Sequence, residues 1–185
     1  STGWHAEFGD IDNDGLADLF IAKGNVDQMP GSAMKAPNNL LIQRADGTFR
    51  ETAAEAGVAS FARSRGATLV DLNLDGLLDI VVVNRRAPLE IWLNRSQQMG
   101  NWATVDLRSD EPNRFAIGAW LEIERDGEVE WRERTIGGGH VSGSLLPLHI
   151  GLGHLDSAQV RVWWPDGTSS DWHSISHGAR VTLSP

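Results

Sequence analysis

The sequence predicts an all-β protein that begins with propeller-type repeats and ends in a small β-sandwich or barrel. Helix signals are scarce, because the best candidate, residues 51–56 before Gly57, is one or two turns long at most. Short apolar or alternating segments separated by turn residues recur along the chain, as expected for strands. One strand–turn–strand pattern occurs twice in the first half, which indicates an internal repeat.

The repeat consists of two pairs of short strands. Residues 4–8 alternate between apolar and polar side chains, and residues 19–22 form an apolar run. Residues 67–69 and 80–83 repeat this order. An Asp-rich turn joins the strands of each pair, and the second turn begins 61 residues after the first. A repeat of this length is typical of propeller blades or a similar array.

The second half has a different strand pattern. Residues 121–124 alternate and turn at Asp126-Gly127, and residues 160–164 alternate into a turn at 165–167. The polar segment 95–100 between the two patterns is expected to be a linker. We therefore expect the repeats with Asp-rich turns to form about two blades in residues 1–97, and a second β domain in residues 98–185.

The composition argues against several functions. A net charge of −9 disfavours binding to nucleic acid or anionic lipid. The chain has no cysteine, which excludes disulfides and thiolate metal sites, and no apolar run long enough for a transmembrane helix. The start at Ser1 has no signal-peptide pattern, so we expect a piece of a longer protein or a processed one.

Each Asp-rich turn is nine residues long and has side-chain oxygen donors at positions 1, 3, 5 and 9. The backbone carbonyl of position 7 is a fifth predicted donor, and glycine at position 6 permits the sharp reversal. Calcium prefers roughly six to eight oxygen ligands and tolerates irregular geometry. We therefore predict two structural Ca²⁺ sites, one formed by Asp10, Asp12, Asp14, Leu16 and Asp18, the other by Asp71, Asn73, Asp75, Leu77 and Asp79.

Other interpretations of these loops fit less well. An EF-hand needs a glutamate at position 12, where this chain has Ile21 and Val82. Magnesium demands stricter octahedral geometry, and a metal-free Asx-rich turn leaves carboxylates crowded together. Because Asn73 replaces a carboxylate, we expect the second site to bind calcium more weakly than the first.

No catalytic pattern stands out. His140 lies in the Gly-rich segment 137–144, which could be a base–nucleophile site, an anion-binding nest or simply a β connection. His149 alternates with apolar residues in a strand, and Asp171 could pair with His173, but no third partner is evident. Whether the chain belongs to an enzyme is left open.

Eight tryptophans and no tyrosine make up an unusual aromatic balance. Trp163 and Trp164 occupy adjacent positions of a predicted strand, so their side chains point to opposite faces. We expect one in the core. The other is expected to pack against the linker or the other domain, with a surface contact to a carbohydrate or protein as the alternative.

The Asp-rich loops and their flanking strands resemble the FG-GAP, or VCBS, repeats of integrin α-subunit propellers and many secreted bacterial proteins. Residues 113–119, 137–139, 148–153 and 162–168 are similar, in order, to motifs of the ASPIC/UnbV domain. Together these stretches resemble the C-terminal portion of a cartilage-acidic-protein-like or UnbV-like protein. Trp120, Leu121 and His140 depart from the family pattern.

The resemblance implies an extracellular or periplasmic module in which calcium stabilises propeller-type repeats. The implied function is non-catalytic support of protein or glycan binding at a surface, without nucleic acid or membrane insertion. The alternative is part of an UnbV-like enzyme in natural-product biosynthesis of the enediyne type, with structural calcium. A propeller needs roughly four to eight blades, so the remaining blades are expected on a missing N-terminal segment or another chain.

Overall fold

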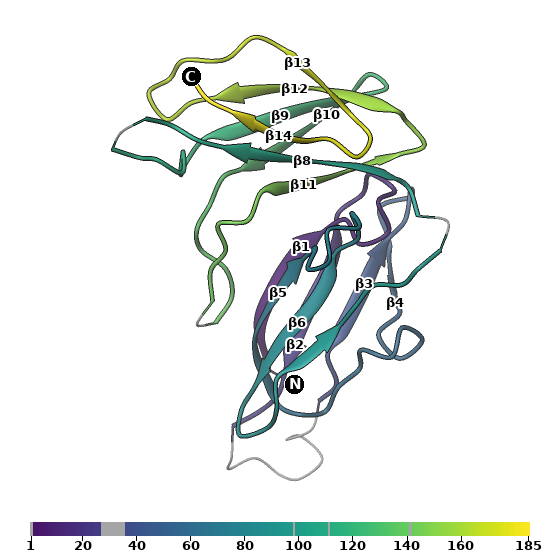
Figure 1. Ribbon diagram of the computed structural model, residues 1–185. Helices are drawn as coiled ribbons and strands as arrows, with labels where there is room; N and C mark the ends of the chain where they lie inside the picture. The colour runs from purple at the N-terminus through teal and green to yellow at the C-terminus, as the bar shows by residue number, and fades with distance from the viewer. Residues whose placement is uncertain (1, 27–35, 98, 111, 141) are drawn as a thin grey trace. The chain divides into compact units, whose positions relative to one another are not determined.

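The computed structural model describes residues 2–26, 36–97, 99–110, 112–140 and 142–185 (Figure 1). The elements of this described part are all β-strands, which confirms the all-β prediction. Residues 53–57 form turns and the Ala56 amide donates to the Thr52 carbonyl at 2.9 Å, so the segment expected to be helical, residues 51–56, contains a single turn. No helix of the described ranges is long and apolar enough to span a membrane.

The chain forms two compact units. The first contains Ser1–Ile11, Leu16–Ser96 and Gly137–Ser144, and the second contains Asp12–Gly15, Gln97–Ile136 and Leu145–Pro185. One change of unit, between Ser96 and Gln97, lies in the polar segment 95–100, of which residue 98 lies outside the described residues. Segments 12–15 and 137–144 also belong to a different unit from their neighbours in the sequence.

The first sheet of the first unit is an antiparallel meander in the order β1-β2-β3-β4. Its strands are β1 (Gly3–Gly9), β2 (Asp18–Lys23), β3 (Asn39–Gln43) and β4 (Phe49–Glu51). The first Asp-rich loop joins β1 to β2, and Asp46-Gly47 forms the predicted turn between β3 and β4.

The second sheet of this unit repeats the first without a fourth strand. It has the order β5-β6-β7, with β5 (Ser64–Val70), β6 (Asp79–Asn84) and β7 (Glu90–Trp92). The second Asp-rich loop joins β5 to β6, and the strand pairing shifts register near the start of both β1 and β5. The internal repeat predicted from the sequence is therefore present as two similar antiparallel sheets.

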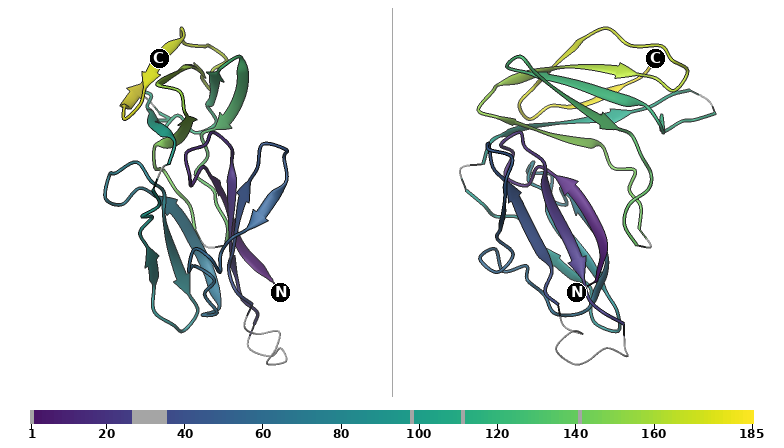
Figure 2. Two further views of the ribbon diagram at one scale, coloured as in Figure 1. Left: turned by 90° about the vertical axis from the view of Figure 1, so that its right-hand side faces the viewer. Right: turned by 180° about the vertical axis from the view of Figure 1, so that it is seen from behind.

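One apolar core lies between these two sheets, with β1 and β2 packed against β5 (Figure 2). Phe20, Ala22 and Val82 are fully buried there. Gly9 lies so close to the second sheet that a Cβ on it would meet Leu69 Cδ1 at 2.7 Å. Close approach of the sheets therefore explains why glycine ends β1.

Both sheets also carry exposed apolar side chains outside this core. Phe8 is 65% exposed on the first sheet, and Val83 and Ile91 are 55% and 53% exposed on the second. Among the described strands no sheet closes on itself. Apolar surface on both outer sides is what an internal section of a larger repeat array would show.

The second unit is built from two open sheets. One has the order β10-β9-β12-β13, and the other has the order β11-β8-β14, in which β14 pairs with β8 in parallel. The strand bounds are β8 (Asn101–Leu107), β9 (Trp120–Arg125), β10 (Glu128–Glu133), β11 (Leu148–Gly153), β12 (Ser157–Trp163), β13 (His173–Ser176) and β14 (Arg180–Leu183).

The core of the second unit draws side chains from both sheets, as in a β-sandwich. Leu121, Ile123, Val160 and Val162 alternate inward from the central strands and are fully buried. Trp164, just after β12, is 5% exposed and belongs to this core, whereas Trp163 is 37% exposed. The prediction that the two tryptophans face opposite sides is confirmed.

Arg134 is the largest buried polar side chain of this unit and is 1% exposed. Its guanidinium donates to Asp106 Oδ1 at 3.1 Å and to the Leu145 carbonyl at 2.9 Å, and it also bonds the Leu146 carbonyl. These contacts tie the end of β10 to β8 and to the segment that precedes β11.

Candidate metal centre

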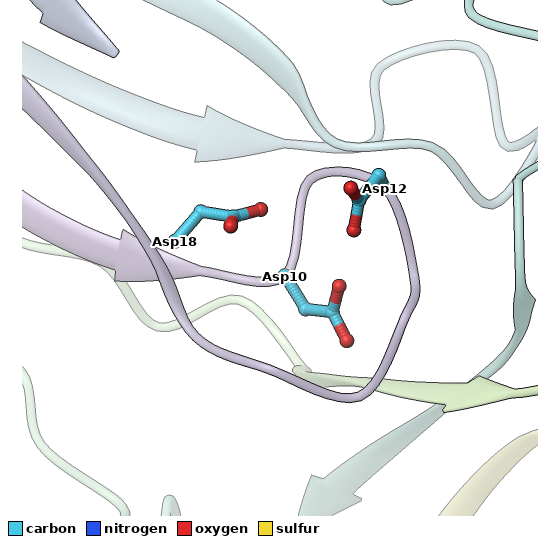
Figure 3. Close-up of side chains that lie close together, drawn as sticks. All are labelled: Asp10, Asp12 and Asp18. Carbon is cyan, nitrogen blue, oxygen red and sulfur yellow. The ribbon is translucent and has the colours of Figure 1, made fainter. Parts of the chain in front are cut away.

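Three carboxylates converge in the first Asp-rich loop. Asp10, Asp12 and Asp18 each place an oxygen within 4.8 Å of the others. The carboxylates of Asp10 and Asp12 point into the space enclosed by the loop, and that of Asp18 lies beside the backbone that follows Asp10 (Figure 3). Asp10 and Asp18 are completely buried, and Asp12 is half-buried. An all-oxygen donor set of this kind suits Ca²⁺ or Mg²⁺ and lacks the nitrogen or sulfur ligands typical of zinc.

The backbone of the loop has the same form in both repeats. Gly15 and Gly76 at position 6 have φ of 94° and 87°, as required by the sharp reversal. Asn13 and Leu74 at position 4 have φ of 59° and 63°. Asparagine tolerates this left-handed conformation, whereas leucine adopts it at a cost.

The aspartate at position 9 closes each loop through hydrogen bonds to backbone amides. Asp18 accepts from Ile11 N at 2.8 Å and from Gln43 N at 2.9 Å. Asp79 accepts from Leu72 N at 3.0 Å and from Asn94 N at 2.7 Å. This residue therefore links the loop to β3 in the first sheet and to the residues just after β7 in the second, a role that spacing alone did not predict.

The electrostatics of the first loop favour a bound cation. Burial raises the pKa of Asp12, and the nearby negative charge of Asp14 raises it further. Holding several partly desolvated carboxylates within a few ångströms is unfavourable unless protons or a cation offset their charge. The residues present therefore fit a divalent cation with oxygen ligands.

The other predicted ligands are arranged differently. Asp14 is exposed and is not one of the three converging carboxylates, and Leu16 is half-buried. In the second loop, Asp71 accepts from the amides of Asp75 and Gly76 at 3.0 and 2.9 Å. The Asn73 side chain donates to Asp75 at 2.8 Å.

The second loop is also more open than the first. Asn73 and Asp75 are exposed, Asp71 and Leu77 are half-buried, and only Asp79 is buried among its predicted ligands. Within the described ranges, its three aspartates do not converge as those of the first loop do. The two loops share a backbone form but differ in how far their carboxylates are gathered.

Two buried histidines have roles that the sequence did not indicate. The first is His149 of β11, whose Nε2 lies 2.7 Å from Asn13 Oδ1 within the second unit. Burial lowers the pKa of His149 to about 4, helped by the charges of Arg132 and Arg180. His149 is therefore neutral at pH 7 and can donate from Nε2 to the asparagine at position 4 of the loop.

The second is His5 of β1, which is 3% exposed. Its Nδ1 lies 2.8 Å from Ser142 Oγ and accepts from the Gly139 amide at 3.1 Å, while its Nε2 lies 3.0 Å from Glu7 Oε2. The chain of contacts from serine to histidine to carboxylate joins the Gly-rich segment to β1. His140, the histidine of this segment considered from the sequence, instead packs against Trp4 with ring centroids 4.8 Å apart.

The comparisons with known proteins agree with this architecture. Residues 10–82 match the family model of the FG-GAP-like repeat, and residues 109–185 match that of ASPIC and UnbV. The chain combines an FG-GAP-like repeat region with an ASPIC and UnbV domain. The resemblance seen in the sequence motifs is therefore confirmed.

Three curated relatives are similar to half or more of this chain. The chain is 30% identical to cartilage acidic protein 1 of Mus musculus over 167 residues, which are 85% of this chain and 25% of that protein. It is 44% identical to cartilage acidic protein 1 of Homo sapiens over 99 residues, or 51% of this chain and 15% of that protein. The Xenopus tropicalis protein is 31% identical over 127 residues, which cover 66% of this chain and 18% of the relative. This chain thus spans a quarter or less of the length of these relatives.

Proposed function

We propose that this chain is a calcium-binding, non-catalytic β module that supports binding of a protein or glycan at a surface. The observation that carries the calcium assignment is the convergence of Asp10, Asp12 and Asp18, two of them completely buried. Bound Ca²⁺ would offset their mutual repulsion and fix the turn between β1 and β2. The exposed Asp14 would need to turn inward to complete the predicted set.

Calcium in this proposal is structural. Asp18 already joins the loop to β3 through backbone amides, so an ion held by the same carboxylate would stabilise the whole first sheet. The second loop, with a neutral Asn73 and more exposed donors, is proposed as the weaker site. We expect both sites to bind calcium with the affinity of extracellular modules, about 10⁻⁴–10⁻³ M, and we propose an extracellular or periplasmic location.

The repeats are proposed to form part of a closed propeller. Apolar side chains such as Phe8 on one sheet and Val83 on the other would be covered by further blades. A longer chain could supply these blades, since the curated relatives are at least four times as long as the region matched here. The alternative source is another chain.

Isothermal titration calorimetry in calcium-free buffer tests the assignment. We expect the unmodified chain to bind two Ca²⁺ ions and Asp10→Asn to lose the tighter site. Asp71→Asn should lose the weaker site. Asp126→Asn is the matched control, because it removes the same charge from a turn outside both loops and asparagine tolerates its φ of 49°.

Two results would contradict the assignment. One is calcium binding by Asp10→Asn that equals that of Asp126→Asn. The other is a tighter second site, which would reverse the proposed order. Chelation of bound calcium should also lower the melting temperature of the first unit more than that of the second, because the whole second loop, and Asp10 and Asp18 of the first, belong to the first unit and ligand binding stabilises the structure that holds the ligand.

A second candidate function is catalysis, favoured by the contacts among Ser142, His5 and Glu7. A histidine between a hydroxyl and a carboxylate can activate the hydroxyl as a nucleophile. However, Nδ1 of His5 is shared with the Gly139 amide, and the ring is almost completely buried. We therefore assign this group to holding the Gly-rich segment. Labelling of Ser142 by a fluorophosphonate probe, lost in Ser142→Ala, would instead support an enzyme.

A further inference from the structure

The outward face of the sheet β10-β9-β12-β13 in the second unit carries four exposed tryptophans. Trp120 is 43% exposed, Trp131 47%, Trp163 37% and Trp172 42%. The opposite face of the same sheet supplies Leu121, Ile123, Val160 and Val162 to the core. Half of the eight tryptophans in the chain are thus gathered on one solvent-facing surface.

Strand register places these side chains in two adjacent rows. Trp131 is opposite Glu122, and Glu122 is opposite Arg161, so these three share one row across β10, β9 and β12. Arg161 lies 4.6 Å from the ring centroid of Trp172, which extends the row toward β13. Trp120 and Trp163 are directly opposite each other in the next row. Four strands at about 4.8 Å spacing make the first row about 14 Å long.

The centre of this surface is held rigidly by Glu122 and Arg161. Glu122 is 7% exposed and accepts from Trp163 Nε1 at 3.0 Å and from Arg161 Nε at 2.8 Å. Arg161 also stacks over Trp163 at 5.0 Å, and the rings of Trp131 and Trp163 lie 6.3 Å apart. Trp163 is therefore held by Glu122 at its indole N–H and contacted by Arg161 and Trp131 at its ring before any ligand arrives. Fixed side chains bind with less loss of conformational entropy.

We propose that this tryptophan surface binds a neutral polysaccharide. The C–H faces of pyranose rings stack on exposed indole rings, and the sugar hydroxyls can bond the carboxylate and guanidinium between them. A row of about 14 Å suits several linked sugar units better than a single one. This inference deepens the surface binding proposed above and rests on it, but it does not depend on calcium.

Charge selects a neutral ligand over an anionic one. Glu122, Glu124 and Glu133 occupy this face by register, against the single guanidinium of Arg161. The chain as a whole also carries a net charge of −9. Sulfated or uronic polysaccharides would be repelled by this surface.

The same polar centre disfavours a protein partner. Glutamate is depleted in the buried core of protein interfaces, whereas here Glu122, paired with Arg161, lies in the middle of the aromatic group. A sugar chain offers both hydroxyls and C–H faces along its length, which matches a surface that alternates rings with charged groups.

The test measures binding of the whole chain to immobilised neutral hexasaccharides, including β-1,4-linked glucose, N-acetylglucosamine and mannose, with heparin as the anionic contrast. We expect at least one neutral hexasaccharide to bind and heparin not to bind. Trp131→Ala and Trp163→Ala should each weaken binding about tenfold. Phe61→Ala is the control, since it removes a 55% exposed aromatic ring from the first unit.

Absence of binding to every neutral hexasaccharide would overturn the inference, as would binding that both tryptophan variants retain. Self-association of the chain that is lost in Trp163→Ala would identify a second copy as the occupant and would also overturn it. Repeating the measurement in chelator keeps the two proposals apart. If the chain binds glycan but not calcium, the glycan inference holds and the calcium assignment fails. If it binds calcium but not glycan, the calcium assignment holds and the glycan inference fails.

Discussion

Acidification should destabilise the second unit through one buried histidine. His149 is 8% exposed, its Nε2 lies 2.7 Å from Asn13 Oδ1, and its ring stacks on Trp102 at 6.2 Å. Protonation would place a second N–H and a positive charge in this site, close to Arg132 and Arg180. The folded protein is therefore more stable with the His149 ring neutral than with it protonated.

The magnitude follows from the difference in pKa between the folded and unfolded chain. Burial lowers the pKa of His149 from 6.5 to about 4, and each pKa unit corresponds to about 1.4 kcal/mol. Because the folded pKa is depressed, the full stability is present above pH 6.5. About 3 kcal/mol is then lost as the pH falls from 6.5 to 4.

Urea unfolding followed by circular dichroism between pH 7.5 and pH 4 measures this loss, with chelator present so that calcium release does not contribute. His149→Gln keeps an amide donor for Asn13 but cannot titrate, so it should lose about 3 kcal/mol less over this range. His173→Gln, which changes an exposed histidine on β13, should behave as the unmodified chain. The raised pKa of Asp12 acts in the opposite direction, since protonation relieves its cost, and it is common to all three proteins.

The reasoning is refuted if the unmodified chain and His149→Gln lose the same stability between pH 7.5 and pH 4. Direct titration of the His149 ring by nuclear magnetic resonance provides a second check. A folded-state pKa near 6.5 would show that the ring is not desolvated as its burial indicates.

Three further substitutions test local features of the fold. Leu74→Asn should raise the free energy of unfolding by about 1 kcal/mol in a urea titration, because asparagine tolerates the φ of 63° at this position better than leucine. Arg134→Met should lower it by about 3 kcal/mol, since buried acceptors lose their donor, and a nearly unchanged value would show that they find other partners. Gly139→Ala would place a Cβ 2.4 Å from His5 Cα, so amide hydrogen exchange in the Gly-rich segment should speed up. Gly137→Ala meets nothing within 4 Å and should leave that exchange unchanged.

Local patterns in the sequence were sufficient for several features. Alternation predicted that Trp163 and Trp164 face opposite sides, because successive strand residues always do so. The glycines at position 6 predicted the reversal of both loops, because a positive φ is a property of one residue and its neighbours. The expected helix at residues 51–56 proved to be a single turn, since a few helix-favouring residues cannot offset the cost of nucleation.

The sequence by itself therefore determined the all-β class, the repeat and the backbone form of the two Asp-rich loops. Only the tertiary structure decided which carboxylates converge, because the burial of Asp10 and Asp18 depends on the strands packed around them. The tertiary structure also decided that Ser142 contacts His5, because folding brings the Gly-rich segment next to β1. It placed Trp131 and Trp163 on one surface, because strand register pairs residues that are far apart in the chain. Short-range conformational preferences can be inferred from neighbours in the sequence, whereas the groups that bind a cation or a ligand are assembled by long-range pairing.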